Sequence, residues 1–171
     1  MEQEDKKWHA GDGKPASWDE IIADLHTAYK MGSLVYVGSD SFKEQLYCAF
    51  VVTICIHNPG HGGRYYFCRF KQPSKLIKSM RMRLFQEAQE AISIALEITQ
   101  AIPKLGVEVH LDVNKDKRHA SGEVTDQVVG YAQAMGLKYK IKPDAWASSG
   151  IADKHTRNAF LSKRRPRVVD A

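Results

Sequence analysis

The chain has 171 residues, of which 43% are hydrophobic, and its formal net charge is +5. That length suits one compact domain with its own core, whereas two domains would each be small. No apolar run approaches the roughly 20 residues that cross a bilayer, and the N-terminal segment lacks the apolar centre of a signal peptide. We therefore expect a cytoplasmic protein that does not bind membranes.

The first elements in chain order are a polar segment and a helix. Residues 1–16 show no apolar periodicity and are predicted to be flexible. Ser17 begins a helix, Glu20 completes a capping box three residues later, and Gly32 lies near the helix end. We place the single domain at 17–162, before a basic tail.

Three consecutive strands are predicted after this helix. They are rich in β-branched and aromatic residues, and a Gly/Pro-rich turn joins the second strand to the third. Short connections of this kind give an antiparallel meander. His57 and His61 lie beside or within the turn and could hold a metal, but a hairpin explains the segment without one. The strands are predicted at 34–39, 45–57 and 64–70.

The cysteines of the chain all lie in or near these strands. Cys48, Cys55 and Cys68 are odd in number and show no CxxC spacing. Their pattern argues against a disulfide framework and against a zinc knuckle. We expect reduced thiols in the core.

The second half of the chain alternates helices with strands. A helical repeat of apolar residues covers 75–101 and stops near Pro103. Because interleaved helices provide crossover connections, the last two strands are expected to run parallel to the first. The predicted fold is α/β, a mixed five-stranded sheet with helices on both faces. The later elements are a strand at 106–113, a helix at 122–136, a strand at 137–142 and a helix at 148–163.

Two predicted strands carry an acid at their C-terminal ends. The run "LVYVGSDSF" leads to Asp40, and "HLDVN" contains Asp112. A carboxylate at the end of a buried strand is costly unless it is paired or binds a cation. If these strands are parallel neighbours, both acids emerge at the sheet edge where open α/β sheets place their sites. Asp40 also suits a turn or cap, and His110 is either a ligand or a satisfied core histidine.

The long predicted helix carries Glu87, Glu90 and Glu97. At about 100° per residue, Glu87 falls beside the buried stripe, whereas Glu90 and Glu97 point to solvent. Only Glu87 can lean toward the sheet, and the alternative is an exposed acid paired with Arg83. Asp153 lies near the start of the last helix, where the helix dipole alone explains an acid.

Four segments, in this order, resemble the bacterial YkuK-type family of predicted ribonuclease H-like proteins. They are "VGSDSF", "RLFQEAQEAISIA", "HLDVN" and "KPDAWASSGIADKHT", and the resemblance runs from about Trp18 to Phe160. It implies a ribonuclease H-like fold. One departure is Phe42, which stands where the family is expected to have a polar residue.

The resemblance implies a metal site of four acids: Asp40, Glu87, Asp112 and Asp153. Carboxylate ligands suit hard ions such as Mg²⁺ or Mn²⁺, and two such ions promote hydrolysis of a phosphodiester. Asp40 is expected to bridge both ions, Glu87 and Asp112 to hold one, and Asp153 to hold the other.

Residues around these acids complete the predicted site. His155 is a candidate proton shuttle or aid to product release, and Asp144 is the alternative to Asp153 as the fourth acid. The basic tail at 163–171 is typical of a nucleic-acid-binding segment and equally of a solvated terminus. Candidate phosphate contacts are Lys75, Lys78, Arg81, Lys115, Arg118, Lys154 and Arg157.

The predicted function is metal-dependent hydrolysis of nucleic-acid phosphodiesters. The alternative is a catalytically inactive ribonuclease H-like protein that binds nucleic acid or acts as a scaffold. The sequence contains neither a GxxxxGK[ST] loop nor a GxSxG elbow, which argues against P-loop and serine chemistry. RNA, DNA, hybrids and junctions all remain candidate substrates, and both monomer and dimer remain open.

Overall fold

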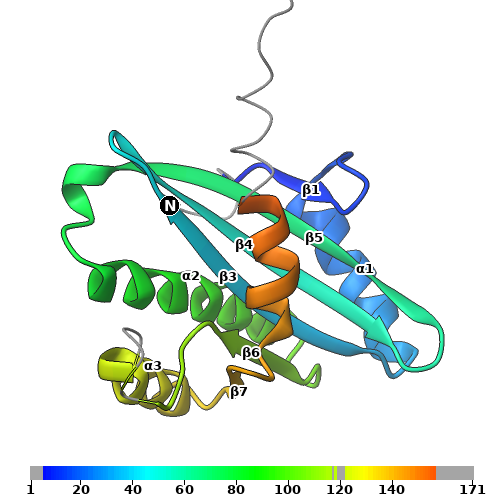
Figure 1. Cartoon of the computed structure of the whole chain (residues 1–171). Coiled ribbons are helices and arrows are strands. Elements are labelled where there is room, and N and C mark those ends of the chain that lie inside the picture. The colour runs from blue at the N-terminus through cyan, green and yellow to red at the C-terminus, as the bar shows by residue number, and fades with distance from the viewer. Residues whose placement is uncertain (1–5, 117, 119–121, 157–171) are drawn as a thin grey trace, which may run out of the picture.

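The computed structural model describes residues 6–116, 118 and 122–156 of the chain. These residues form a mixed sheet with helices on both faces (Figure 1). The strand order across the sheet is β2-β1-β5-β4-β3-β6-β7. The strands are β1 (Trp8–Ala10), β2 (Pro15–Ala16), β3 (Leu34–Lys43), β4 (Tyr47–Asn58), β5 (Gly62–Pro73), β6 (Val107–Leu111) and β7 (Lys138–Ile141). The helices are α1 (Trp18–Lys30), α2 (Met80–Ala101) and α3 (Gly122–Ala134), with a 3-10 turn η2 (Ser74–Leu76) and a π-helical segment η3 (Ala147–Ala152).

All five predicted strands form, and they follow the predicted topology. β3, β4 and β5 make an antiparallel meander, and a tight turn joins β4 to β5. β6 pairs parallel with β3, and β7 pairs parallel with β6. The prediction of a mixed α/β sheet is therefore confirmed in its strand directions.

The sheet has two strands more than predicted, because the N-terminal segment is ordered over part of its length. β1 pairs antiparallel with both β5 and β2. Trp8 is 2% exposed, and its ring centroid lies 5.7 Å from that of Trp18. Lys6 Nζ lies 3.1 Å from Glu90 Oε2, so this glutamate does not simply point to solvent. The expectation of a flexible 1–16 is wrong from Lys6 onward, since burial of Trp8 anchors the segment to the sheet.

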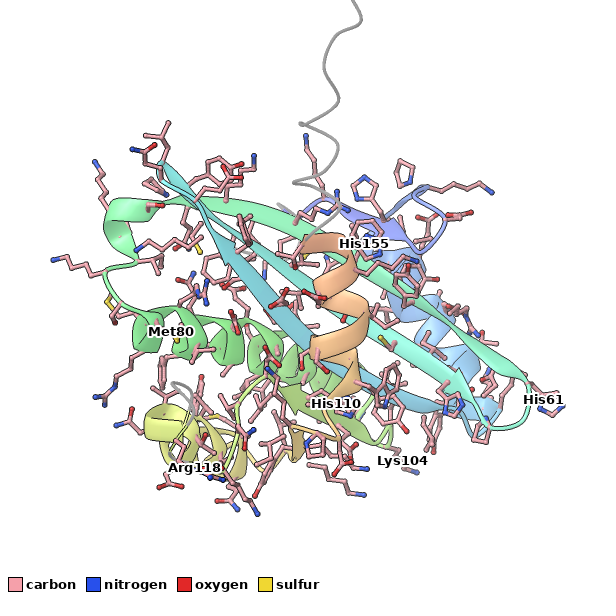
Figure 2. The ribbon with its side chains drawn as sticks, viewed as in Figure 1. His61, Met80, Lys104, His110, Arg118 and His155 are labelled. Atoms are coloured by element: carbon pink, nitrogen blue, oxygen red, sulfur yellow. The ribbon has the colours of Figure 1, made fainter. Side chains whose placement is uncertain are left out.

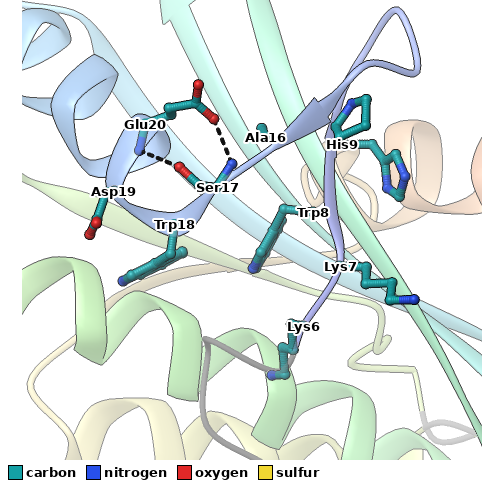
Figure 3. A pocket seen from close by; sticks show the side chains of 10 residues that line it. Lys6, Lys7, Trp8, His9, Ala16, Ser17, Trp18, Asp19 and Glu20 are labelled. Atoms are coloured by element: carbon teal, nitrogen blue, oxygen red, sulfur yellow. Dashed lines mark hydrogen bonds between the residues drawn. The ribbon is translucent and has the colours of Figure 1, made fainter.

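The start of α1 matches its prediction, and the start of α2 does not. The Ser17 side chain accepts a hydrogen bond from the Glu20 N–H (3.1 Å), and the Glu20 carboxylate accepts one from the Ser17 N–H (2.7 Å), as Figure 3 shows. α2 begins at Met80 instead of residue 75, because Ser79 caps it by accepting from a backbone N–H of its first turn. The preceding residues form η2.

Each face of the sheet has its own cover. Val35 and Val37 of β3 point into the main core, which contains the apolar sides of α1, α2 and α3. On the other face, Ala152 at the end of η3 packs against Val51 and Phe67. Figure 1 shows η3, in orange, crossing the side of the sheet opposite to α1.

Three contacts seat η3 on the sheet. A Cβ atom at Gly38 would lie 2.5 Å from the backbone nitrogen of Ser148, so the close approach requires glycine. The Thr53 hydroxyl donates to the Ala147 carbonyl (3.2 Å), and the Ala147 N–H donates to His110 Nδ1 (3.0 Å). The predicted last helix thus begins over the middle of β3 and is helical through residue 156.

The state of the cysteines agrees with the sequence analysis. Cys48, Cys55 and Cys68 are free and buried, which confirms the prediction of reduced core thiols. Among the described residues, no helix combines the length and the apolar content needed to cross a membrane.

Candidate metal centre

The parallel pairing of β3 with β6 brings two predicted acids together. Gly38 is paired with His110 in the register of these strands, and Asp40 and Asp112 each follow two residues later. β6 ends just before Asp112, whereas β3 continues past Asp40 in its pairing with β4. The two acids therefore meet at the carboxyl end of β6.

The third acid comes from α2. Glu87 is 5% exposed, and its carboxylate accepts a hydrogen bond from the Ser41 hydroxyl. Carboxylate oxygens of Asp40, Glu87 and Asp112 all lie within 4.8 Å of one another. Glu87 is therefore a buried member of an acidic cluster and not an exposed partner of Arg83.

The carboxylates of this cluster disfavour one another's charged forms. Burial raises the pKa of Glu87 to about 8, the Ser41 hydrogen bond opposes this shift, and the charges of Asp40 and Asp112 add to it. The pKa of Asp40 is raised to about 6, first by burial and then by the charges of Asp112 and Asp153. The acidic cluster therefore favours a cation among its oxygens.

One lysine faces the acidic cluster. Lys142 Nζ lies 2.9 Å from Asp112 Oδ1. The contact is an ion pair without hydrogen-bond geometry, since this oxygen has no hydrogen-bond partner among the described residues. The Lys142 side chain is 41% exposed, and its backbone N–H donates to the Val113 carbonyl (3.0 Å). The backbone of this lysine is thus fixed beside Asp112, while its ammonium has access to solvent.

The predicted fourth acid follows η3 directly. The charge of Asp153 raises the pKa of Asp40, whereas the nearby Thr156 side chain lowers it; the Thr156 hydroxyl donates to the Ala152 carbonyl (2.9 Å). Asp144 is exposed after β7, and its charge acts on His110 instead, where it only partly opposes the lowering of the pKa by burial. Electrostatics therefore favour Asp153 over Asp144 as the acid that accompanies the cluster.

A family model described as Ribonuclease H-like matches residues 18–157, a range that includes every acid considered above. This chain belongs to the ribonuclease H-like family. The resemblance to the YkuK-type proteins and the expected fold class are thereby confirmed. No match was found among curated proteins or among solved structures.

In this ribonuclease H-like domain, His155 contacts β5 and not the carboxylates. Its ring stacks on Phe67, with 3.8 Å between the ring centroids. Its Nδ1 lies 3.1 Å from an Arg69 guanidinium nitrogen, and its Nε2 lies 3.0 Å from the Tyr65 hydroxyl. Burial, together with the charges of Arg69 and Lys154, lowers the pKa of His155 to about 4. These contacts give no support to the predicted proton shuttle.

The other histidines raised by the sequence have ordinary partners. His110 is 1% exposed, accepts from Ala147 at Nδ1, and places Nε2 3.2 Å from Glu108 Oε1. It is thus a satisfied core histidine. His61 is exposed in the hairpin turn, with Nδ1 3.2 Å from the Pro59 carbonyl. In the part of the chain that the structure describes, the acidic cluster is the arrangement suited to a metal ion.

The predicted phosphate contacts that fall within the described residues lie on the surface. Arg81 is in the first turn of α2, six residues before Glu87 and about 9 Å from it along the axis. Arg118 is paired with Asp116, with 2.6 Å between the charged atoms. Arg157 and the basic tail lie outside the described residues. The exposed side chains are those of Lys75, Lys78, Arg81, Lys115, Arg118 and Lys154.

Sequence reasoning missed three polar side chains of this centre: Ser41, Thr156 and Lys142. Ser41 follows Asp40 directly, but its contact with α2 depends on how the helix packs. Lys142 had a detectable signal, because β7 pairs in parallel with β6 and ends one residue before it. The residues that follow two paired parallel strands stand side by side, which places this lysine next to Asp112.

Proposed function

We propose that this protein hydrolyses phosphodiester bonds of nucleic acid with the help of divalent metal ions. The observation that carries the proposal is the meeting of Asp40, Glu87 and Asp112, whose oxygens lie within 4.8 Å of one another. Membership of the ribonuclease H-like family supports it. A mainly structural role does not explain why three acids converge where burial raises the pKa of two of them.

The donor set suits Mg²⁺ or Mn²⁺. Such ions prefer carboxylate oxygens, and their charge relieves the repulsion within the acidic cluster. Asp40, Glu87 and Asp112 would hold one ion, and Asp40 and Asp153 would hold a second. When bound, the ions lower the pKa of a coordinated water and stabilise the charge that develops on the phosphate.

The chain's own residues would orient the site and the substrate. The Ser41 hydrogen bond fixes the carboxylate of Glu87, and the Thr156 side chain lies near Asp40. The exposed cations at the start of α2, Lys78 and Arg81 among them, are available for phosphate contacts. Such contacts fix the position of a strand without reading its sequence.

One observation favours the second candidate, a ribonuclease H-like protein that binds nucleic acid without cleaving it. Lys142 already neutralises part of the acidic cluster, at 2.9 Å from Asp112. In a protein that needs no metal ion, this lysine would supply the cation that balances the charge of the acids. The two candidates differ in whether Mn²⁺ is required for the action of the protein.

The test is a cleavage panel with and without Mn²⁺. Single strands, duplexes, RNA–DNA hybrids and four-way junctions are incubated with the full chain and with Asp112→Asn. We expect cleavage of at least one substrate, dependent on Mn²⁺ and reduced by at least about a hundredfold in Asp112→Asn, since this acid supplies a ligand. Binding without cleavage by either protein, across salt and pH, would support the second candidate.

A further inference from the structure

A cavity of about 600 Å³ lies between β1 and β5, on the face of the sheet that carries η3. We call it the β1–β5 pocket. Its lining is cationic and aromatic, and its one acid, Asp12, is paired with Lys14 at 3.2 Å. Figure 3 shows Lys7 and His9 on the side of β1 opposite to Trp8. The pocket is lined by Lys7, His9, Gly11, Asp12, Gly13, Phe67, Arg69 and His155.

Neither Arg69 nor Lys7, the two permanently charged cations of this pocket, has a carboxylate partner among the described residues. Arg64 is paired with Asp24 at 2.6 Å, and Arg118 with Asp116 at the same distance. The guanidinium of Arg69 lies 5.0 Å from the centroid of the Phe67 ring. Arg69 is exposed to solvent, and partial desolvation of its guanidinium lowers its pKa. An anionic ligand would complete its environment.

His155 fixes the orientation of Arg69. A guanidinium only donates hydrogen bonds, so His155 Nδ1 must accept from Arg69, and the ring proton lies on Nε2. That Nε2–H donates to the Tyr65 hydroxyl oxygen at 3.0 Å. Stacking keeps the imidazole ring of His155 nearly parallel to the Phe67 ring. One edge of the guanidinium is thereby used, and its remaining N–H groups are free for a bidentate contact.

The aromatic side of the pocket suits a base. The rings of His9 and Phe67 are stacked, with 5.5 Å between their centroids and an angle of 23°. His9 is only half-buried, whereas Phe67 is covered by its neighbours. Bases of single-stranded nucleic acid stack on aromatic rings of this kind without sequence preference. Lys7, exposed two residues before His9, adds a second positive charge.

The position of the pocket links it to the acidic cluster. Asp40 is paired with Val51, and Val51 is paired with Arg69, so the three lie in one row across the sheet and on one face. Two strand spacings separate Arg69 from Asp40, or about 10 Å. The helix that carries Ala152 covers Val51 between them, so a nucleic-acid strand bound at the acidic cluster would pass around this helix to reach the pocket.

We propose that the β1–β5 pocket binds one unpaired nucleotide of the nucleic-acid substrate, with its phosphate on Arg69 and Lys7 and its base against His9. This inference rests on the proposed function and adds a subsite to it. Arg69 is a binding residue in this account, and His155 is a positioning residue that acts through it.

Binding of a labelled single-stranded oligothymidylate by fluorescence anisotropy, in EDTA so that no cleavage occurs, tests the inference. We expect Arg69→Met to weaken binding about tenfold and to reduce the slope of log affinity against log salt by about 0.7, the value for one phosphate contact on a single strand. Lys104→Met is the matched control, because this lysine is exposed near the start of β6 and away from His155 (Figure 2). It should bind as the wild type does.

Two further variants and one competitor complete the test. His9→Ala should weaken oligonucleotide binding about five- to tenfold through lost stacking. Lys7→Met, at an exposed position, should reduce the salt slope even if Arg69→Met fails to fold. Equal affinities and salt slopes for Arg69→Met, Lys7→Met and Lys104→Met would overturn the inference. Full displacement of the oligonucleotide by low concentrations of inorganic phosphate would also overturn it, in favour of a small-anion site.

These outcomes are separable from those of the cleavage panel. If the protein cleaves with Mn²⁺ and Arg69→Met binds the oligonucleotide as the wild type does, the pocket proposal is wrong and the nuclease proposal stands. If oligonucleotide binding depends on Arg69 but the protein cleaves no substrate, the pocket proposal is supported and the nuclease proposal is wrong.

Discussion

At Glu87, burial and two neighbouring carboxylates act in the same direction. Each raises the pKa of the side chain, which reaches about 8. The helical spacing of α2 predicted that Glu87 leans toward the sheet while Glu97 does not. The pKa could not be predicted in the same way, because it depends on Asp40 and Asp112, which are 47 and 25 residues from Glu87 along the chain.

We predict that Glu87→Gln stabilises the metal-free protein above neutral pH. The folded pKa is raised from 4.5 to about 8, so the folded state binds more protons than the unfolded state between these values. The contribution of Glu87 to the free energy of unfolding of the wild type is therefore fully present below pH 4.5 and is lost as the pH rises to 8. Glutamine cannot ionise, and we expect a gain on the order of 2 kcal/mol at pH 8, measured by urea unfolding in EDTA. Glu97→Gln, on the same helix, is the control, and an identical pH dependence in all three proteins would contradict the prediction.

Lys142 would compete with a metal ion for Asp112. The lysine ammonium lies 2.9 Å from Asp112 Oδ1, where it opposes a second cation. We predict that Lys142→Met raises the affinity for Mn²⁺ about three- to fivefold, the range expected for a partly exposed ion pair. Isothermal titration of Mn²⁺ measures this change. Lys140→Met, two residues earlier and 4.0 Å from Glu108, should leave the affinity unchanged. An unaltered or lower affinity in Lys142→Met would show that the lysine does not compete.

At the scale of elements, the packing of η3 on the sheet sets the position of Asp153, which directly follows it. The Thr53 hydroxyl and His110 Nδ1 both bond to Ala147, at the first turn of this segment. The Gly38 position allows the backbone of η3 to approach β3. Asp153 and Thr156 follow on the same helix, so their effect on the pKa of Asp40 depends on how η3 packs on the sheet.

We predict that Gly38→Ala destabilises the protein by about 1 to 3 kcal/mol, the usual cost of an overpacked contact. Its Cβ would lie 2.5 Å from one backbone atom of η3 and 2.6 Å from another. Mn²⁺ affinity should fall as well, because Asp153 moves with the helix. Gly130→Ala is the control, since this exposed position in α3 has no atom within 4 Å of a new Cβ and should gain about 0.5 to 1 kcal/mol. If urea unfolding gives both variants the same stability, η3 does not pack closely against Gly38.

Local sequence signals predicted some elements well and others poorly. The capping box at Ser17 located the start of α1, because both of its hydrogen bonds lie within four residues. The start of α2 was placed five residues early, since the apolar pattern continues back through Ile77 and only the cap at Ser79 marks the boundary. The π-helical turns of η3 have no local signature that we detected, because they result from contacts with β3 and β4.

At the scale of the whole molecule, the order of elements carried more information than any single motif. Alternation of helices and strands predicted that β6 runs parallel to β3, and the observed pairing of these two strands brings Asp40 to Asp112. The N-terminal strands were missed because β1 has three residues and β2 has two, too few for a period-two pattern. β1 pairs with β5 and β2 pairs with β1, which extends the sheet by two strands, and β1 provides one wall of the β1–β5 pocket.

The central claim is that Asp40, Glu87 and Asp112 form a binding site for a hard divalent cation. A crystal structure of the full chain with Mn²⁺, with anomalous difference density, tests it most directly. The account predicts a peak within about 2 Å of oxygens from all three acids, with the Lys142 ammonium moved away from Asp112. It is contradicted if the acidic cluster holds no peak, with Lys142 still on Asp112, while Mn²⁺ binds elsewhere on the same molecule.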